Sequence, residues 1–385
     1  MHIGVLGTFD VDNYGDHLFP RVAEHELGRR LSEAVVTSYS PYGRLHPTPL
    51  DGGRAAEPLG PWTPERAAEL AEAHDLLVVG GGELIHLNDP LLAPVYDTTP
   101  DELRRMAPSR WFVEGLGPEL EARCPVVWHG LGVPWAPGEE EAGRLRAALA
   151  HRPYVTVRDR ASAQRLAAAG VERAVEVVPD SALLINRILP PASLSAFLDR
   201  LRTAGGYPPP GTPPVLLQGC DLLMPHLEDV VVAVERWRVA QVDCGPLLAL
   251  ETGRCRGDGL FADAVERAVG SRHVWRLPAG PAVEDLAAVI GGGEVFVGSS
   301  LHGAITALAY GRPFVLLNLH GEAKLDGFGD LTGLGGRVVH RAADIPAALE
   351  EAVADPTPAG LLDSLQRRLD RHFDRLAELA SARAV

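Results

Sequence analysis

A histidine set among small residues, His302, is the clearest candidate for chemistry in this sequence. It lies in V-F-V-G-S-S-L-H-G-A-I, a pattern that predicts a buried strand, a turn of small residues and the start of a helix. The free N–H groups at such a helix start bind anions, and the hydroxyl of Ser299 or Ser300 can cap the helix or donate to a ligand. Beside an anion, His302 can act as a general acid or base near neutral pH. This loop, which includes Gly303, is therefore a predicted anion site.

Two further cations are predicted to serve the same anion. Lys324 is the only lysine among the 36 lysines and arginines, and it follows a predicted strand. If this strand neighbours the one before His302, Lys324 reaches the same anion as a compact, movable charge. Arg158 ends another predicted strand, where its guanidinium can hold a carboxylate or phosphate through two hydrogen bonds. For both residues a solvated charge is the alternative.

Two loops earlier in the chain are candidates for binding a polar ligand. In D-V-D-N-Y-G-D, Asn13 and Asp16 can hydrogen-bond a hydroxyl group, and Asp16 can cap the helix expected to begin near residue 17. Beside the positive end of that helix Asp16 is expected to stay ionised, which suits hydroxyl binding or deprotonation. Where V-V-G-G-G ends a buried strand, the backbone of Gly80, Gly81 and Gly82 can approach a ligand closely. A helix cap and a tight turn are the alternatives.

These residues can act together only in a fold that brings the ends of several strands to one place. The sequence pattern predicts such a fold. Short β-branched and leucine-rich runs alternate with alanine-rich helical stretches, as in buried parallel strands joined by helices. The fold class is therefore α/β, with two Rossmann-like doubly wound domains facing each other across a cleft where ligands bind. We expect an N-terminal domain over residues 1–190, a C-terminal domain over 191–358, and an amphipathic helix over 359–385 that can pack across them.

The individual elements follow from the same pattern. The predicted strands are 3–9, 35–39, 76–79, 125–129, 155–157, 175–178, 215–218, 241–243, 273–276, 295–297 and 314–317. The predicted helices are 17–31, 64–73, 139–150, 161–169, 227–237, 260–269, 283–291 and 304–309. Residues 44–61, rich in proline, glycine and acidic side chains, are predicted to be an irregular insertion.

Composition narrows the class of protein further. The 385 residues are 46% hydrophobic and 23% charged, which excludes wholesale disorder. The 51 acidic residues give a formal net charge of −15, so binding to nucleic acid or an anionic membrane is disfavoured. The four cysteines have neither disulfide-framework nor zinc-site spacing, and no stretch approaches about 18 uninterrupted apolar residues. We expect a cytoplasmic, soluble protein with no integral membrane segment and no metal; an oligomer is compatible with the sequence.

The sequence resembles the polysaccharide pyruvyl transferase family. The motifs that carry the resemblance occur in order along the chain: N-Y-G-D, V-V-G-G-G, V-R-D-R-A-S, V-P-D and G-S-S-L-H-G-A-I-T-A-L-A-Y-G-R-P. The resemblance implies a fold similar to GT-B glycosyltransferases. It also implies transfer of a pyruvyl group from phosphoenolpyruvate to hydroxyls of a sugar or glycan, with a pyruvate ketal and phosphate as products. Phosphoenolpyruvate is then the donor substrate, and no cofactor is implied.

The resemblance also assigns roles to residues. The family's donor-binding arginine, histidine and lysine fall on Arg158, His302 and Lys324, with His302 as the candidate acid and Asp16 as a possible base. The family commonly has S-R-L-H-G, whereas this chain has Ser300 in place of that arginine, so one cation is missing. The remaining candidates are Ser299, Ser300 and Gly303 on the donor side, and Asn13, Gly80, Gly81 and Gly82 on the acceptor side.

Two other functions stay open from the sequence. One is a glycosyltransferase that uses a nucleotide sugar on the same two-domain frame, which predicts nucleotide binding to the second domain. The other is a catalytically degenerate binding protein of the same fold, which predicts ligand binding without turnover. The sequence does not identify the acceptor, the position of the ketal or the oligomeric state.

Overall fold

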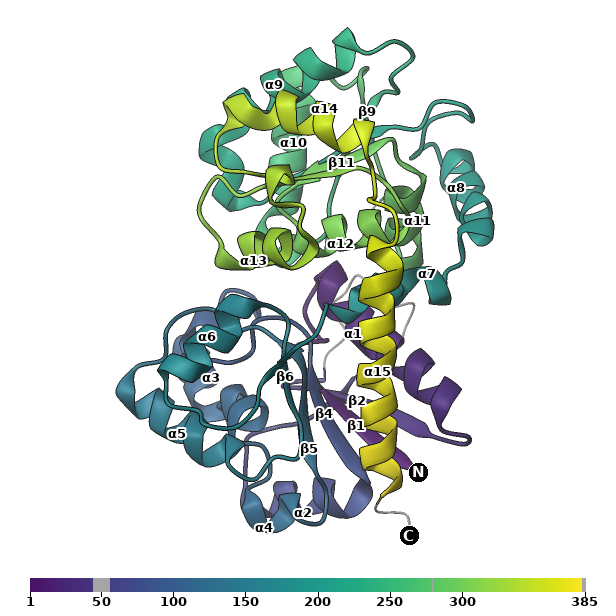
Figure 1. Cartoon of the computed structure of the whole chain (residues 1–385). Coiled ribbons are helices and arrows are strands. Elements are labelled where there is room, and N and C mark those ends of the chain that lie inside the picture. The colour runs from purple at the N-terminus through teal and green to yellow at the C-terminus, as the bar shows by residue number, and fades with distance from the viewer. Residues whose placement is uncertain (44–55, 279, 383–385) are drawn as a thin grey trace.

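The computed structural model describes residues 1–43, 56–278 and 280–382, and it contains two parallel β-sheets surrounded by helices (Figure 1). The first sheet contains β1 (His2–Leu6), β2 (Val35–Ser40), β3 (Glu57–Pro58), β4 (Leu76–Gly80), β5 (Val126–Leu131), β6 (Val155–Val157) and β7 (Glu176–Val177). The second contains β8 (Val215–Gln218), β9 (Leu247–Leu250), β10 (Val274–Arg276), β11 (Val295–Gly298), β12 (Phe314–Leu317) and β13 (Val338–Val339). This confirms the predicted α/β class.

Helices connect the strands. The α-helices are α1 (Tyr14–Arg30), α2 (Pro64–Ala73), α3 (Pro100–Met106), α4 (Pro118–Glu121), α5 (Glu139–Leu149), α6 (Arg160–Ala168), α7 (Ile185–Ile188), α8 (Leu194–Thr203), α9 (Leu227–Ala240), α10 (Asp258–Val269), α11 (Val283–Gly292), α12 (Leu301–Ala309), α13 (Ala323–Thr332), α14 (Ile345–Ala354) and α15 (Leu361–Ser381). The short 3-10 helices are η1 (Asp89–Leu92), η3 (Ser181–Leu184), η4 (Pro191–Ser193), η5 (Asp221–His226), η6 (Arg254–Arg256), η7 (Gly335–Arg337) and η8 (Ala342–Asp344), and η2 (Arg110–Glu114) is a π-helix. Across the described part of the chain no single helix is long and apolar enough to cross a membrane; one pair, Ser181–Ile188 with Pro191–Thr203, meets that length and composition test only together and is bent by 56°.

The two sheets share one winding pattern. Their strand orders are β3-β2-β1-β4-β5-β6-β7 and β10-β9-β8-β11-β12-β13, and the strand pairs are parallel. In each sheet the chain starts at a central strand, builds outward on one side and then returns to build the other side. The order therefore reverses between β1 and β4 and between β8 and β11. Loops leaving the carboxyl ends of these strands form the crevice where doubly wound sheets bind ligands.

The hydrophobic core does not stop at the boundary between the sheets. One cluster lies beneath β4 and β5 of the first sheet, and another beneath β8 and β9 of the second. The largest cluster runs through both: it includes Ile3 in β1, Leu18 in α1, Ile305 in α12 and Leu316 in β12. Helix α1 contacts α11 and α12, so it belongs to the packing of both halves.

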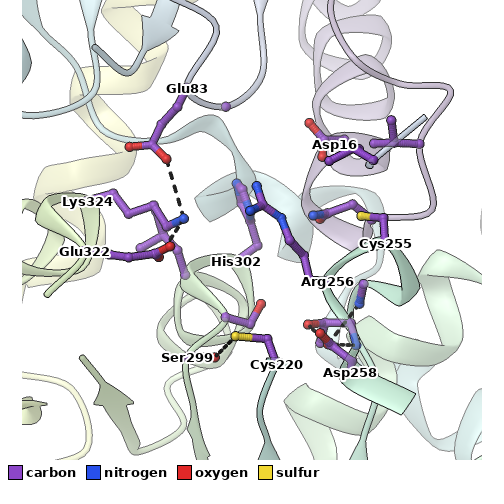
Figure 2. Close-up of a pocket in the computed structure, with 18 of the residues that line it drawn as sticks. Asp16, Glu83, Cys220, Cys255, Arg256, Asp258, Ser299, His302, Glu322 and Lys324 are labelled. Atoms are coloured by element: carbon purple, nitrogen blue, oxygen red, sulfur yellow. Dashed lines mark hydrogen bonds and ion pairs between the residues drawn. The ribbon is translucent and has the colours of Figure 1, made fainter. Parts of the chain in front are cut away.

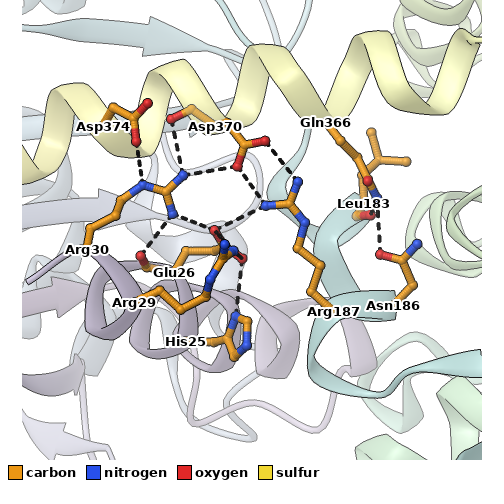
Figure 3. Close-up of polar contacts among 10 residues, drawn as sticks. All are labelled: His25, Glu26, Arg29, Arg30, Leu183, Asn186, Arg187, Gln366, Asp370 and Asp374. Atoms are coloured by element: carbon orange, nitrogen blue, oxygen red, sulfur yellow. Dashed lines mark hydrogen bonds and ion pairs between the residues drawn. The ribbon is translucent and has the colours of Figure 1, made fainter.

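The C-terminal helix α15 lies along α1 and η3 (Figures 1 and 3). Its Asp370 accepts hydrogen bonds from Arg187 at 2.7 Å and from Arg30 at 3.0 Å. The fully buried Glu26 of α1 accepts from Arg30 at 2.6 Å. Burial alone would raise the pKa of Glu26, but Arg30 and Arg187 hold it below its usual value. An ion-pair network thus fastens the last helix of the chain to the first.

Several predicted elements differ from those observed. The first strand ends at Leu6 instead of residue 9, and α9 continues to Ala240 instead of ending at residue 237. The strand predicted at 241–243 is wrong: these residues follow α9, Val242 is 91% exposed, and Asp243 has a left-handed φ of 62° that fits a turn. The fully buried β9 begins only at Leu247. Helices α1 and α12 each begin three residues earlier than predicted, because Asn13 and Ser300 cap them. Of the predicted insertion, residues 44–55 lie outside the described residues, and β3 pairs with β2.

Candidate active site

A pocket lies between the carboxyl ends of the two sheets and is lined from both halves of the chain. Figure 2 shows side chains converging on it from opposite sides, with Glu83 and Asp16 facing Lys324, His302 and Arg256. The loops that follow the strands supply the chemical groups: Asn13 and Asp16 after β1, Glu83 after β4, Arg158 after β6, Cys220 after β8, Arg256 after β9, Ser299, Ser300 and His302 after β11, and Lys324 after β12. The fold therefore brings most of the predicted residues to one place.

His302 is positioned by the way that α12 begins. Ser300 caps the helix: its hydroxyl accepts a hydrogen bond from the Gly303 N–H at 3.2 Å. The Ser300 N–H donates to the side chain of Gln218 at 2.8 Å, which ties this turn to the end of β8. His302 therefore lies in the first turn of a capped helix whose start faces the pocket.

The imidazole ring of His302 is enclosed by residues of the first half. Its Nε2 lies 3.4 Å from the Asp180 carboxylate, and its ring meets Phe19 edge-on at 5.5 Å between ring centres. Gly15 closes a third side, because a Cβ placed there would lie 1.9 Å from Nδ1. The ring fits only because residue 15 has no side chain. His302 is thus held by α1 and η3, although it belongs to the second half.

Asp180 has two functions in the structure. Its Oδ1 accepts a hydrogen bond from the Ala182 N–H at 3.0 Å and caps η3. Its Oδ2 is buried and faces His302. Burial would raise the pKa of Asp180, but His302, the helix cap and Arg158 together lower it. The carboxylate is therefore held charged beside the imidazole ring.

Asp16 differs from its prediction in two respects. Asn13 caps α1 instead, its side chain accepting from the Gly15 N–H at 2.9 Å, so Asp16 lies inside the first turn. Burial raises the pKa of Asp16, whereas the expectation from the helix dipole alone was a carboxylate held ionised. Thr8 donates to its Oδ1 at 2.9 Å. A carboxyl group with a raised pKa beside a pocket is suited to accepting a proton from a hydroxyl.

Arg158 and Lys324 meet through one carboxylate. Glu83, directly after the three glycines, lies 3.3 Å from Arg158 Nη2 and 3.5 Å from Lys324 Nζ, and Glu322 lies 2.7 Å from the same Nζ. Burial would raise the pKa of Glu83, but Arg158, Lys324 and Arg256 together lower it. The two predicted donor cations do share a site, and carboxylates neutralise both of them there.

The small residues among the candidates divide into lining and packing positions. Gly82, with a φ of 80°, lines the pocket, and a Cβ there would lie 3.6 Å from the Asp16 carboxylate. Gly81 abuts Phe19 and Gly80 abuts His129, so these two serve packing. Gly303 packs against Phe296, where a Cβ would come within 2.3 Å, and its N–H is taken by the Ser300 cap. Ser299 lines the pocket and donates to Cys220 Sγ at 3.6 Å.

A buried carboxyl group, Asp258, holds the β9 loop in place. It accepts from the N–H of Thr252 at 2.8 Å, the N–H of Gly253 at 3.0 Å and the Gln218 amide at 2.9 Å. Because Gln218 also accepts from Ser300, a chain of hydrogen bonds connects the β9 loop to the His302 turn. Burial raises the pKa of Asp258 to about 6.

The two cysteines that line the pocket, Cys220 and Cys255, are not activated as nucleophiles. Burial raises the pKa of the Cys255 thiol to about 12 and also raises that of Cys220, so both stay protonated near neutral pH. None of the four cysteines, all of which lie within the described residues, forms a disulfide. Within residues 1–43, 56–278 and 280–382, no group of three or more His, Cys, Asp or Glu side chains is arranged to hold a metal ion.

Sequence reasoning missed Glu83, Glu322 and Arg256, and it did not place Asp180 among the site residues. Glu83 could have been found from its place beside V-V-G-G-G, and Glu322 from its place beside Lys324. Arg256 has no such signal, because the sequence pattern predicts a strand at 241–243, whereas the observed β9 ends at Leu250 and Arg256 follows its loop.

The chain matches one protein family by sequence and several solved structures by fold. A family model described as polysaccharide pyruvyl transferase matches residues 13–321. No match is found among curated proteins. The UDP-GlcNAc 2-epimerase from Neisseria meningitidis bound to UDP-GlcNAc is similar in structure, with a TM-score of 0.56, 11% identity, and coverage of 96% of this chain and 99% of that one. The UDP-GlcNAc 2-epimerase from Methanocaldococcus jannaschii is similar with a TM-score of 0.54 and 12% identity, and the match covers 96% of this chain and 99% of that one. At these identities the likeness shows the fold alone, two Rossmann-like domains in a GT-B-like arrangement.

Proposed function

Since this chain belongs to the polysaccharide pyruvyl transferase family, we propose that it transfers the pyruvyl group of phosphoenolpyruvate to two hydroxyls of a sugar or glycan. The products are a pyruvate ketal and phosphate. The observation that carries the proposal is the meeting of Arg158, Lys324 and His302 in one pocket, although they come from three separate loops. Such a set of cations beside an acid suits a small donor with a phosphate and a carboxylate.

Donor binding requires the cations to exchange partners. Arg158 can hold an acidic group through two hydrogen bonds, and Lys324 contributes a point charge. Both contact Glu83 in the structure, so the donor takes over contacts that this carboxylate now makes. As phosphate departs, the cations stabilise the negative charge that develops on it.

The reaction needs one proton delivered to carbon and two hydroxyls deprotonated. His302 protonates the methylene carbon of the donor, which becomes the methyl group, while a sugar hydroxyl attacks the adjacent carbon. The bond from that carbon to the phosphate oxygen breaks, and the second hydroxyl closes the ketal on the same carbon. Of the two hydroxyl protons, one balances the new methyl group and the other leaves with phosphate. Asp180, 3.4 Å from Nε2, offsets the positive charge that His302 carries when it is protonated.

The acceptor binds on the first-half side of the pocket. Asn13, Asp16 and Gly82 line this side, and Asp16 is the candidate base because burial raises its pKa. Gly82 has no side chain to occupy the space beside the Asp16 carboxylate, where a Cβ would lie 3.6 Å from Oδ1. A hydroxyl held there loses its proton to Asp16 as it attacks.

Calorimetric titration of the whole chain with phosphoenolpyruvate tests the donor assignment. We expect binding that Lys324→Ala and His302→Ala each weaken at least tenfold. His340→Ala should bind like the wild type, because that histidine is exposed and pairs with Asp326 outside the pocket. Binding of nucleoside diphosphates without phosphoenolpyruvate would overturn the proposal in favour of glycosyl transfer.

Turnover is tested by phosphate release from phosphoenolpyruvate in the presence of a panel of glycosides with neighbouring hydroxyls. We expect release that depends on both substrates and a product heavier than the glycoside by one ketal-linked pyruvyl group. Tight donor binding with no release across free, nucleotide-linked and lipid-linked sugars would favour a binding protein instead.

A further inference from the structure

Arg256 is a cation in the pocket to which the mechanism above gives no task. It ends η6, directly after the loop that leaves β9, and it lines the same pocket as His302 and Lys324. Figure 2 shows its side chain extending into the pocket from the side of Cys255 and Asp258. The residue is exposed, so its guanidinium is accessible to a ligand that enters.

The guanidinium of Arg256 is not committed to a carboxylate. Among the described residues it forms neither a hydrogen bond nor an ion pair, whereas Arg158 and Lys324 both contact Glu83. Its surroundings are nevertheless negative, because Asp16, Glu83 and Glu322 all lie within electrostatic range. An arginine in such a place is available to an incoming anion without first losing a partner.

The charge of the donor makes such a residue necessary. Phosphoenolpyruvate carries about three negative charges at neutral pH, two on phosphate and one on carboxylate. Arg158 and Lys324 are balanced by Glu83 and Glu322, and a protonated His302 is balanced by Asp180. These six groups together carry no net positive charge, and Asp16 adds a negative one when ionised. Without another cation the pocket would repel the donor it is meant to hold.

We propose that Arg256 is a donor-binding residue, which supplies from the β9 loop the positive charge that the other pocket groups lack. This inference rests on the proposed function, because it assumes that phosphoenolpyruvate is the donor. Arg256 binds one of the two acidic groups of phosphoenolpyruvate through its planar pair of N–H donors. The start of this loop is anchored, because Asp258 accepts hydrogen bonds from the N–H groups of Thr252 and Gly253. Arg256 also supplies a positive charge that the family's arginine would otherwise provide at position 300, where this chain has Ser300 as the cap of α12.

The test compares two arginines on the same short turn. Arg256→Gln removes the pocket cation, while Arg254→Gln is the matched control, because Arg254 lies 3.8 Å from Asp12 and does not line this pocket. In calorimetric titrations with phosphoenolpyruvate we expect Arg256→Gln to raise the dissociation constant roughly ten- to hundredfold, as the loss of a charge-assisted hydrogen bond does. Arg254→Gln should match the wild type.

Further arms separate the possible failures. Titration with inorganic phosphate and, separately, with pyruvate shows which acidic group Arg256 holds, because only the probe carrying that group binds more weakly to Arg256→Gln. Arg256→Lys keeps the charge and should recover part of the affinity, which a merely structural role would not predict. If the wild type does not bind phosphoenolpyruvate, the proposed function fails. If it binds and Arg256→Gln binds equally well, the proposed function stands and the role of Arg256 is refuted.

Discussion

Replacing Gly15 by alanine should disable His302 without unfolding the protein. Gly15 lies in the first turn of α1 and does not have a left-handed φ, so the backbone tolerates alanine. The new methyl group, however, would lie 1.9 Å from His302 Nδ1, where ordinary contacts are about 3.5 Å. The ring must therefore retreat by roughly 1.5 Å, and Phe19 and Asp180 limit where it can go.

The size of the effect follows from that displacement. A catalytic group misplaced by about 1 Å costs on the order of a hundredfold in rate. Donor binding should weaken roughly tenfold or more, because a charge-assisted hydrogen bond from His302 is lost. The stability of helix α1 should not decrease, since alanine is favoured over glycine in a helix by up to about 1 kcal/mol.

The matched control is Gly28→Ala in the same helix, where a Cβ meets nothing within 4 Å. Both variants are compared with the wild type by thermal denaturation and by calorimetric titration with phosphoenolpyruvate. We expect all three to unfold at similar temperatures and Gly15→Ala alone to lose donor affinity. If Gly15→Ala binds the donor as tightly as Gly28→Ala, the close approach of His302 to α1 does not govern its function.

Three other perturbations test separate parts of the structure. Glu83→Gln frees Arg158 and Lys324 of their shared carboxylate and should tighten phosphate binding about tenfold by calorimetry; unchanged or weaker binding would contradict this. Glu26→Gln leaves Arg30 and Arg187 without their buried carboxylate and should lower the free energy of unfolding in urea by about 3 kcal/mol. Glu378→Gln, in an exposed pair, should lower it by less than about 0.5 kcal/mol. Equal losses of stability in the two variants would contradict the role of the network. Asp258 has a pKa raised to about 6, so its contribution to stability is present below pH 4 and is lost as pH rises through 6. The unfolding free energy of the wild type should fall relative to Asp258→Asn by about 2 kcal/mol between pH 4 and pH 7, and parallel pH profiles would refute it.

Local pattern was enough to find the strand ends that build the pocket. The runs before His302 and Arg158 are short, apolar and followed by turn or capping residues, so both the elements and the residues at which they end could be predicted. Lys324 stands out because it is the single lysine of the chain. For these residues the sequence immediately around each one was enough to predict its position in the fold.

The partners of those residues could not be predicted in the same way. Asp180 and Gly15 meet His302 only because the two sheets pack through α1, and nothing in the neighbouring sequence encodes that packing. The pKa of Asp16 was misjudged for a related reason: the helix dipole is a local property, whereas the burial that raises its pKa depends on the whole fold. Arg256 was missed because the buried L-L-A-L of β9 lies beyond a turn that contains Val242, which mimics a short strand.

The core that runs without interruption through both sheets has a consequence for recombination between related proteins. A crossover in the proline-rich passage 205–214 looks natural, because it falls between β7 and β8. Such a hybrid would set a native α1 against a foreign α11 and α12, breaking the hydrogen bond between Tyr14 and Thr306 and the ion pair of Arg21 with Glu284. It would also pair α1 with a foreign α15. Exchanging acceptor specificity therefore calls for transplanting individual loops onto one intact scaffold, since the helices of each half have been fitted to the other.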